Sequence, residues 1–270
     1  MFRVIAKGLL SLLLIAAAAA TSSQPSLAAT PAPVLPEKCV VATQQAAFVH
    51  CEIDKVGKYS VAVIGDSHAR SWFAPMLKLA SKYSWRLTII SKSACPVLNP
   101  TSMPHHIPSP TCKLWNENLQ GYLKANHKYD LVVSAASSLV THGYDSYAQS
   151  FKSVVPSLTK SGSELLQIHD NPKPASGFLD CIKKNQNSAS TACARDRASA
   201  LTPNDPLPDA VRGMPGVKVV DFTDSFCGQK TCSPIIDGIV VYKDHSHMSP
   251  EWAMHLLPVL DRSIPEKFKQ

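Results

Sequence analysis

Residues 61–72, VAVIGDSHARSW, decide how the rest of this 270-residue chain can be arranged. The apolar run stops at Gly65, and Asp66, Ser67 and His68 follow at once. This order predicts a buried strand that passes directly into the first turn of a helix, where unpaired backbone N–H groups and the helix dipole favour negative charge. Ser67 is therefore a candidate nucleophile, and a serine hydroxyl needs a base that a third group orients.

Further apolar runs alternate with segments of helical spacing along the chain. The sequence predicts strands at residues 59–64, 86–91, 129–135, 164–169 and 217–221, and helices at 69–83, 113–126, 144–160 and 250–268, the last one interrupted or ended near Pro258 or Pro265. This alternation indicates an α/β fold in which helices cover both faces of a parallel sheet. Ligands of such sheets bind at the carboxyl ends of the strands, which is where Ser67 lies.

The amino-terminal residues have the pattern of an exported protein. Arg3 and Lys7 precede an apolar run at 9–20, and Ser26-Leu27-Ala28 offers a small-residue cleavage site, so residues 1–28 are interpreted as a secretory signal peptide. A retained membrane anchor is the alternative, although the apolar run is shorter than the roughly 20 residues that span a bilayer. We expect the mature protein to be secreted or to lie in the cell envelope.

The rest of the chain divides by composition. Residues 29–55 are interpreted as a Pro-rich linker and a short lead-in, and residues 56–270 as one globular domain that contains the candidate nucleophile, because 45% hydrophobic and 17% charged residues are ordinary for a globular protein. The irregular parts of this domain are a Pro-rich loop at 92–112, a polar insertion at about 170–210 with a helical piece near 193–200, and a short final strand at 239–242.

The charge of the chain is mildly basic. Removal of Arg3 and Lys7 with the signal peptide lowers the formal net charge from +7 to +5. Such a charge suits an anionic surface or polymer of the cell envelope, although a solvated basic face without a partner remains an alternative. Nothing in the sequence indicates a nucleic-acid partner.

The eight cysteines predict four disulfides, since the chain is expected to be exported. Pairing between sequence neighbours is favoured, but spacing leaves other pairings open. The neighbouring pairs are Cys39 with Cys51, Cys95 with Cys112, Cys181 with Cys193, and Cys227 with Cys232. A zinc site is the weaker alternative, because the chain contains no Cys-x-x-Cys pair. We therefore expect no metal.

A candidate base for Ser67 lies near the carboxyl terminus, in the stretch YKDHSHMS at residues 242–249. Asp244 and His247 are three residues apart, so in a turn the carboxylate can accept from one imidazole nitrogen while the other nitrogen faces outward. This is the arrangement that a serine nucleophile requires. His245 is an alternative base, but a residue adjacent to Asp244 points another way in most turns.

Other residues near these landmarks receive simpler interpretations. Asp66 is expected to support the serine turn by hydrogen bonding, and His68 to be a structural residue or part of the site rim. Trp115 and Trp252 remain candidates for lining a sugar site. The remaining histidines singled out as loop residues are His105, His106 and His142.

Together these residues resemble the SGNH, or GDSL-like, serine esterases and acyltransferases. The matching features are Gly65-Asp66-Ser67-His68, Lys92 with Cys95-Pro96, the Cys181 and Cys193 insertion, and Asp244 and His247 followed by Met248-Ser249. The resemblance covers about residues 56–265 and is closest to extracytoplasmic domains attached to membrane acyltransferases that O-acetylate surface polysaccharides. It implies a three-layer α/β/α sandwich with a mostly parallel sheet. It also implies Ser67 as nucleophile, His247 as general base and Asp244 as its orienting acid.

The resemblance leaves the oxyanion hole incomplete. The wider family supplies donors from a glycine after its second strand and an asparagine after its third. Here the third predicted strand runs into Ser134-Ala135-Ala136-Ser137-Ser138, without an asparagine. The surface-glycan branch lacks that motif as well. The backbone N–H of Ser67 is the one donor that we predict.

The predicted function is that of an exported serine-dependent O-acyltransferase, moving an acetyl group onto a cell-envelope polysaccharide without a cofactor. The predicted partners are a glycan and, as acyl donor, a separate membrane acyltransferase, since this chain lacks the membrane half usual in the branch it resembles. The first alternative is a carbohydrate acetylesterase or small-ester hydrolase acting on an acetylated glycan or another ester. The second is a non-catalytic glycan-binding envelope protein on the same fold.

Overall fold

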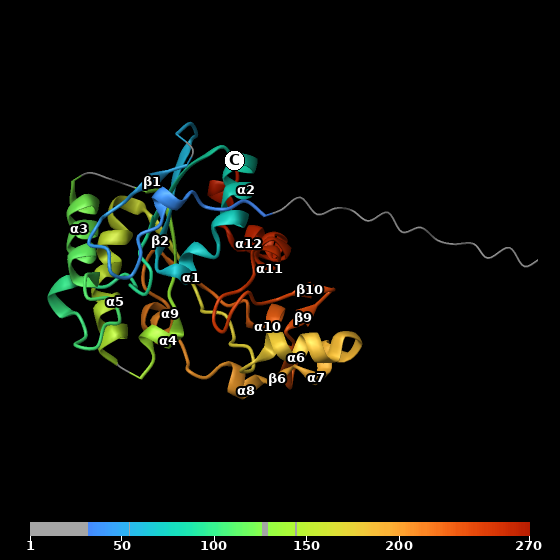
Figure 1. The fold of residues 1–270 in the computed structure, drawn as a ribbon. Helices are drawn as coiled ribbons and strands as arrows, with labels where there is room; N and C mark the ends of the chain where they lie inside the picture. The colour runs from blue at the N-terminus through green and yellow to red at the C-terminus, as the bar shows by residue number, and fades with distance from the viewer. Residues whose placement is uncertain (1–31, 54, 126–128, 144) are drawn as a thin grey trace, which may run out of the picture. The chain divides into compact units, whose positions relative to one another are not determined.

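Six strands form the central sheet of the computed structural model, in the order β1-β3-β2-β4-β5-β7 (Figure 1). All neighbouring strands are parallel except β1, which runs antiparallel to β3. The strands are β1 (Cys51–Glu52), β2 (Tyr59–Gly65), β3 (Trp85–Ser91), β4 (Leu131–Ala135), β5 (Glu164–Ile168) and β7 (Val217–Val220). The predicted mostly parallel sheet is confirmed. Because β2 lies between β3 and β4, the chain reverses its direction of strand addition beside β2, where such folds form their binding crevice.

The structure describes residues 32–53, 55–125, 129–143 and 145–270. The described residues belong to one unit, Pro31–Gln270. The predicted signal peptide at 1–28 and the start of the predicted linker lie outside them. No helix within these ranges is long and apolar enough to cross a membrane.

The alternating side chains of β2 build a core on each face of the sheet. Val61 and Val63 contribute to one buried cluster, whereas Ala62 and Ile64 contribute to the other. The first cluster packs under α2 (Phe73–Tyr83), α11 (Pro250–His255) and α12 (Leu257–Ser263). The second packs under α3 (Cys112–Lys124), α5 (Asp145–Leu158) and α9 (Pro206–Val211). The two sets lie on opposite sides of the sheet in Figure 1, so the three-layer sandwich is confirmed.

Two predicted helices are broken in the structure. The helix predicted at 69–83 starts two residues earlier, as α1 (Ser67–Arg70), and resumes only at α2. Pro75 in the first turn of α2 has no N–H to donate to Ser71, so the helical hydrogen-bond pattern is interrupted there. The carboxyl-terminal helix is interrupted just before Pro258 and ends at Ser263, before Pro265, as its prolines indicated. The ends predicted at residues 126 and 144 lie outside the described residues.

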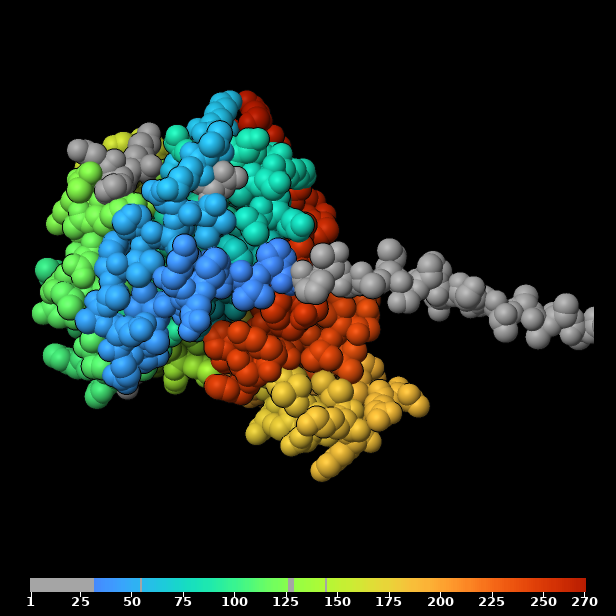
Figure 2. All heavy atoms as spheres, turned by 45° about the horizontal axis from the view of Figure 1, so that its top comes forward, coloured from blue at the N-terminus to red at the C-terminus, as the bar shows by residue number. Residues whose placement is uncertain are grey.

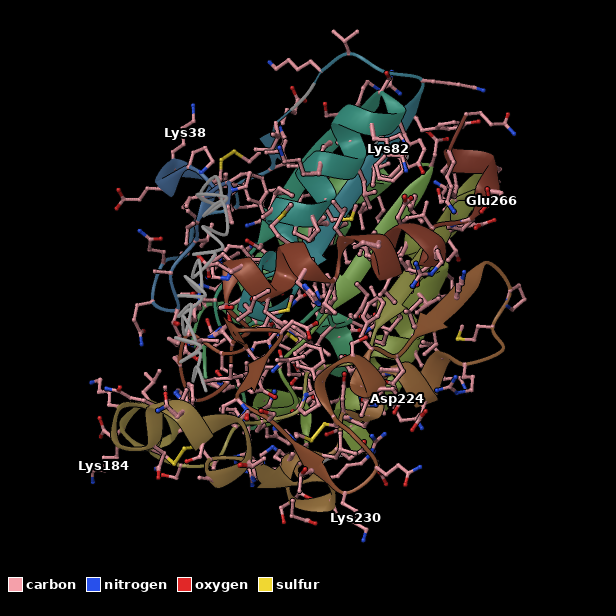
Figure 3. The ribbon with its side chains drawn as sticks, turned by 90° about the vertical axis from the view of Figure 1, so that its right-hand side faces the viewer. Lys38, Lys82, Lys184, Asp224, Lys230 and Glu266 are labelled. Atoms are coloured by element: carbon pink, nitrogen blue, oxygen red, sulfur yellow. A yellow bond between two sulfur atoms is a disulfide. The ribbon has the colours of Figure 1, made fainter. Side chains whose placement is uncertain are left out.

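The region at 170–210 contains more regular structure than its polar sequence indicated. The helical piece expected near 193–200 is α8 (Arg197–Ala200), but three further helices were missed: α6 (Phe178–Asn185), α7 (Ala189–Ala192) and α9. Two-residue strands β6 (Arg195–Asp196) and β8 (Thr231–Cys232) join it to the segment after α10 (Thr223–Phe226). Lys184 and Lys230 point away from this region in Figure 3.

The short strand predicted at 239–242 does not join the main sheet. It forms β10 (Ile239–Val240), which pairs with β9 (Ile235–Ile236) in a separate hairpin. The two turn residues between them, Asp237 and Gly238, have positive φ, as a tight two-residue hairpin requires, so this segment pairs with its sequence neighbour. The predicted neighbour pairing of the cysteines is confirmed for all four disulfides.

Candidate active site

The turn from β2 into α1 depends on Gly65. This residue has a φ of +154°, and a Cβ atom there would lie 2.4 Å from the carbonyl oxygen of Ala135 and 2.8 Å from the Cβ of Ala69. Only glycine avoids both contacts, so β4 and α1 can approach the end of β2 closely. The close approach puts Ser67 at the first position of α1, at the carboxyl end of the sheet.

Asp66 stabilises this turn through hydrogen bonds to its side chain. Its carboxylate is fully buried and accepts hydrogen bonds from the N–H of His68 and the N–H of Ser137, both at 2.8 Å. Burial raises the pKa of Asp66, while these bonds and the charge of His68 oppose the rise. The predicted supporting role of Asp66 is confirmed, and it extends to the loop after β4.

The structure brings the three predicted catalytic residues into contact. The Nε2 atom of His247 lies 2.8 Å from the Oγ of Ser67, and its Nδ1 atom lies 2.9 Å from Oδ2 of Asp244. The Asp244 carboxylate also accepts from the N–H groups of Ser246, at 2.9 Å, and His247, at 2.8 Å. With the Nδ1 proton directed at Asp244, Nε2 is free to accept the hydroxyl proton of Ser67.

The electrostatic surroundings keep this histidine neutral. Burial and the nearby charge of His68 lower the pKa of His247 to about 4, although Asp244 acts in the opposite direction. Burial raises the pKa of Asp244, but the hydrogen bonds from His247 and Ser246 outweigh it and hold that pKa below its usual value. An unprotonated His247 beside an ionised Asp244 is the state that can take a proton from Ser67.

His245, the alternative base, lies elsewhere. Its side chain is exposed, and among the described residues the hydroxyl of Ser67 is paired with His247. His245 lines a neighbouring groove together with Asp244. The geometry therefore favours His247.

A buried ion network behind His247 was missed by sequence reasoning. The Nδ1 atom of His68 lies 2.5 Å from Oδ1 of Asp170, whose other oxygen accepts from Lys173 and from the N–H of Ser138 at 2.6 Å. Burial raises the pKa of Asp170, but the charges of His68 and Lys173 outweigh it and hold that pKa well below its usual value. The ring centroids of His68 and His247 are 4.6 Å apart.

The place of Asp170 in the sequence was the available signal for this network. It stands two residues after the end of β5, and therefore at the same sheet edge as Ser67. His68 is buried, as expected of a structural residue, and it is adjacent to the candidate base, as expected of a residue at the site rim.

Two hollows flank the three contacting residues. A cavity of about 190 Å³ lies on the Ser67 side and is lined by Leu35, Arg70, Phe73 and Met248. A groove of about 800 Å³ lies on the Asp244 side, between that residue and the insertion. Its lining residues include Leu139, Phe178, Leu179, Lys183 and Arg195.

The suggestion that Trp115 and Trp252 line a sugar site is wrong. Both side chains are fully buried, each in one of the two cores beside the sheet, because their helices turn these positions inward. Within the described ranges there is also no group of three or more histidine, cysteine or acidic side chains placed to hold a metal ion.

Comparison with known proteins supports this fold. A search of curated proteins found no match. Among solved structures, the chain is similar to the periplasmic domain of a lipopolysaccharide acetyltransferase from Salmonella ser. Paratyphi A, with a TM-score of 0.59 and 14% identity over 77% of this chain and 84% of that one. A putative GDSL-like lipase from Bacteroides ovatus has a TM-score of 0.47 and 11% identity, over 78% and 54% of the two chains.

A family two carbohydrate esterase from Clostridium thermocellum has a TM-score of 0.43 and 13% identity over 79% of this chain and 65% of that one. At these identities the likenesses concern the fold. The family assignment comes from a sequence model described as "SGNH domain (fused to AT3 domains)", which matches residues 38–262. Since this match spans most of the 270 residues, the chain belongs to the SGNH domain family.

Proposed function

We propose that this protein is an exported serine O-acyltransferase that places an acetyl group on a polysaccharide of the cell envelope. The observation that carries the proposal is the hydrogen-bonded series from Ser67 through His247 to Asp244, at the amino end of α1. Membership of the SGNH family and the similarity to the periplasmic domain of a lipopolysaccharide acetyltransferase support it.

The reaction proceeds through an acyl-enzyme. His247 Nε2 takes the hydroxyl proton as Ser67 Oγ attacks the acyl carbonyl, and Asp244 stabilises the imidazolium that forms. The tetrahedral intermediate then expels the leaving group, which receives the proton from His247. A sugar hydroxyl attacks the acyl-enzyme in the second half, again with His247 as base. The product is an O-acetylated glycan and the free serine.

The two hollows beside the site supply places for the two substrates. The cavity on the Ser67 side has the lining for a small acyl group, since Leu35, Phe73 and Met248 are apolar. The groove on the Asp244 side, about 800 Å³, has room for several sugar units of an acceptor. Its cationic residues Lys183 and Arg195 suit a glycan that carries negative charge.

The acyl donor is proposed to be a separate membrane acyltransferase that meets this protein outside the cytoplasm. The family description, which names fusion to AT3 domains, is consistent with such a pair. The four disulfides fit an oxidising compartment outside the cytoplasm.

Hydrolysis is the second candidate, and one observation favours it. The side chain of His247 is 21% exposed, so water can reach the base that would activate it. An esterase would use the same acyl-enzyme and release acetate. Comparing acetate release with acetyl transfer to an added polysaccharide separates the two functions.

The proposed nucleophile can be tested directly. Wild-type protein should be labelled at Ser67 by a fluorophosphonate probe and should hydrolyse p-nitrophenyl acetate. Ser67→Ala should abolish labelling and reduce the rate at least ~10³-fold, because the covalent route is lost. Ser190→Ala, which removes an exposed hydroxyl on α7, is the matched control and should leave both unchanged. Unlabelled but folded wild-type protein would rule the proposal out.

A further inference from the structure

The backbone donors around Ser67 are largely in use, which leaves a gap in the site. Beyond β3, the N–H of Lys92 donates to Gly65 at 3.1 Å and that of Ser93 to Val41 at 2.9 Å. Beyond β4, the N–H of Ser137 donates to Asp66 and that of Ser138 to Asp170. None of these four N–H groups can donate to a substrate without losing its present hydrogen bond. They therefore do not supply a second oxyanion donor from the loops after β3 and β4.

The N–H of Ser93 is occupied by an amino-terminal segment, residues 39–45, through the carbonyl oxygen of Val41. Lys92 is fully buried, and its ammonium group donates to the carbonyl oxygens of Ala42, Thr43 and Gln45 at 2.8, 3.0 and 2.6 Å. Val41 pairs with Lys92 in a parallel bridge. Figure 2 shows the blue amino-terminal part beside the teal residues of α2 and the orange-red carboxyl-terminal part. The segment therefore covers the carboxyl end of β3, and the N–H of Ser93 is not available to a substrate.

Arg70 is a side-chain donor beside Ser67. The two residues are three apart on α1 and hence on one face of the helix, and both line the cavity of about 190 Å³. Among the residues that the structure describes, the hydrogen bonds of the guanidinium are long ones, to the hydroxyls of Ser91 at 3.5 Å and Ser93 at 3.3 Å. Within the described part of the chain, no carboxylate lies within 4.0 Å of it. Its charge is thus half-buried without an ion-pair partner.

Burial of this kind makes a guanidinium ready to receive an anion. Desolvation lowers the pKa of Arg70, and Asp66 opposes this through space. Negative charge that develops next to a half-buried cation interacts with it more strongly than it would in bulk water, because less water screens the pair. Lys243 also lines the cavity, but its side chain is exposed and therefore screened.

We propose that Arg70 is a catalytic residue that donates to the oxyanion formed on the acyl group at Ser67, alongside the N–H of Ser67 itself. This role rests on the proposed function. As the Ser67 Oγ bond to the acyl carbon forms, the serine proton passes to His247 and the carbonyl π electrons move onto oxygen, which accepts from Arg70. When the carbonyl reforms, the leaving-group bond breaks, and the leaving oxygen takes the proton from His247.

The test compares acylation rates, measured as the pre-steady-state release of p-nitrophenol from p-nitrophenyl acetate. Arg70→Ala should lower the acylation rate by about 10²–10³-fold and change KM by less than about threefold, since the lost interaction is made in the transition state. Arg70→Lys should retain part of the rate, because it keeps the charge without the planar fork. Arg86→Ala is the matched control, as Arg86 is exposed at the amino end of β3, and it should behave as wild type.

Added guanidinium ion separates chemistry from structure. At millimolar concentrations, too low to unfold the protein, guanidinium should raise the acylation rate of Arg70→Ala and leave that of wild type unchanged. An unaltered rate in folded Arg70→Ala or in Arg70→Lys, or a loss that guanidinium does not restore, would overturn the role of Arg70. Should Arg70→Ala fail to fold, the rate of Arg70→Lys decides. Absence of Ser67 labelling in wild type would instead remove the proposed function, so the two failures are distinct.

Discussion

At the scale of the residue, the site is governed by two histidines that face each other. His247 holds Ser67 through one ring nitrogen and Asp244 through the other. His68, whose ring centroid is 4.6 Å away, is held in turn by Asp170. Asp244 favours the protonated form of His247, whereas burial and His68 disfavour it. The balance lowers the pKa of His247 and favours its neutral form, which the proposed role as a base requires.

This balance predicts an unusually acidic limit of activity. The base must be unprotonated, so activity should fall as the pH drops through the pKa of His247, giving a half-maximal kcat/KM at about pH 4 instead of near the ordinary value of 6.5. His68→Gln removes the electrostatic influence of the neighbouring imidazole, which lowers the pKa of His247, so the acidic limb should move towards neutrality. His105→Gln, an exposed loop histidine, is the control. Identical pH profiles for wild type and folded His68→Gln would contradict this account.

At the scale of the element, the decisive feature is the junction between β2 and α1. Helix α1 has only four residues, so its own hydrogen bonds contribute little to its position. Its position depends mainly on the direction in which the chain leaves β2. Gly65 lets the backbone turn in close contact with the carbonyl group of Ala135. The carboxylate of Asp66 then accepts a hydrogen bond from Ser137, in the loop after β4. Ser67 and Arg70 are placed by this junction.

Gly65→Ala should therefore destabilise the protein by at least about 2 kcal/mol, because it adds an unfavourable φ and a clash with the backbone of Ala135. Gly238→Ala is a matched control for the conformation alone, since Gly238 has a φ of +76° and no atom within 4 Å of a built Cβ. Urea unfolding monitored by fluorescence gives both values. An equal effect of the two substitutions would show that the close approach at Gly65 has no cost of its own.

At the scale of the whole described unit, one buried carboxylate joins segments distant in sequence. Asp170 follows β5 and binds His68 of α1, the start of α4 (Ser138–Thr141) at Ser138, and Lys173 of the insertion. Its own N–H donates to Asp205 at 3.2 Å, the residue that caps α9. This network makes the insertion part of the site's support.

Loss of one member of the network should be costly. Asp170→Asn leaves the buried ammonium group of Lys173 without its counter-charge and weakens the bond to His68, so it should lower the free energy of unfolding by about 3–5 kcal/mol. Asp224→Asn is the matched control: Asp224, labelled in Figure 3, pairs with Arg197 at 2.7 Å, but its side chain is 90% exposed, so the substitution should cost about 1 kcal/mol or less. Denaturant titration measures the difference, and similar losses for both variants would argue against a structural role for the network.

The sequence by itself determined the alternation of strands and helices, the serine at a strand end and the Asp244 and His247 pair, and it favoured the neighbour pairing of the cysteines. All of these depend on spacing over a few residues, where chain geometry restricts the outcome. The helices of the insertion were missed because they have only four to eight residues each, which is too short for an apolar periodicity to stand out from its surroundings.

Only the tertiary structure decided which distant groups meet. Ser67 and His247 are 180 residues apart, and His68 and Asp170 are 102 apart. The use of the Ser93 N–H by Val41 has no local signature at all. Hydrogen-bond partners of this kind are selected by how parallel strands align at one sheet edge, and that alignment arises only when both cores are packed.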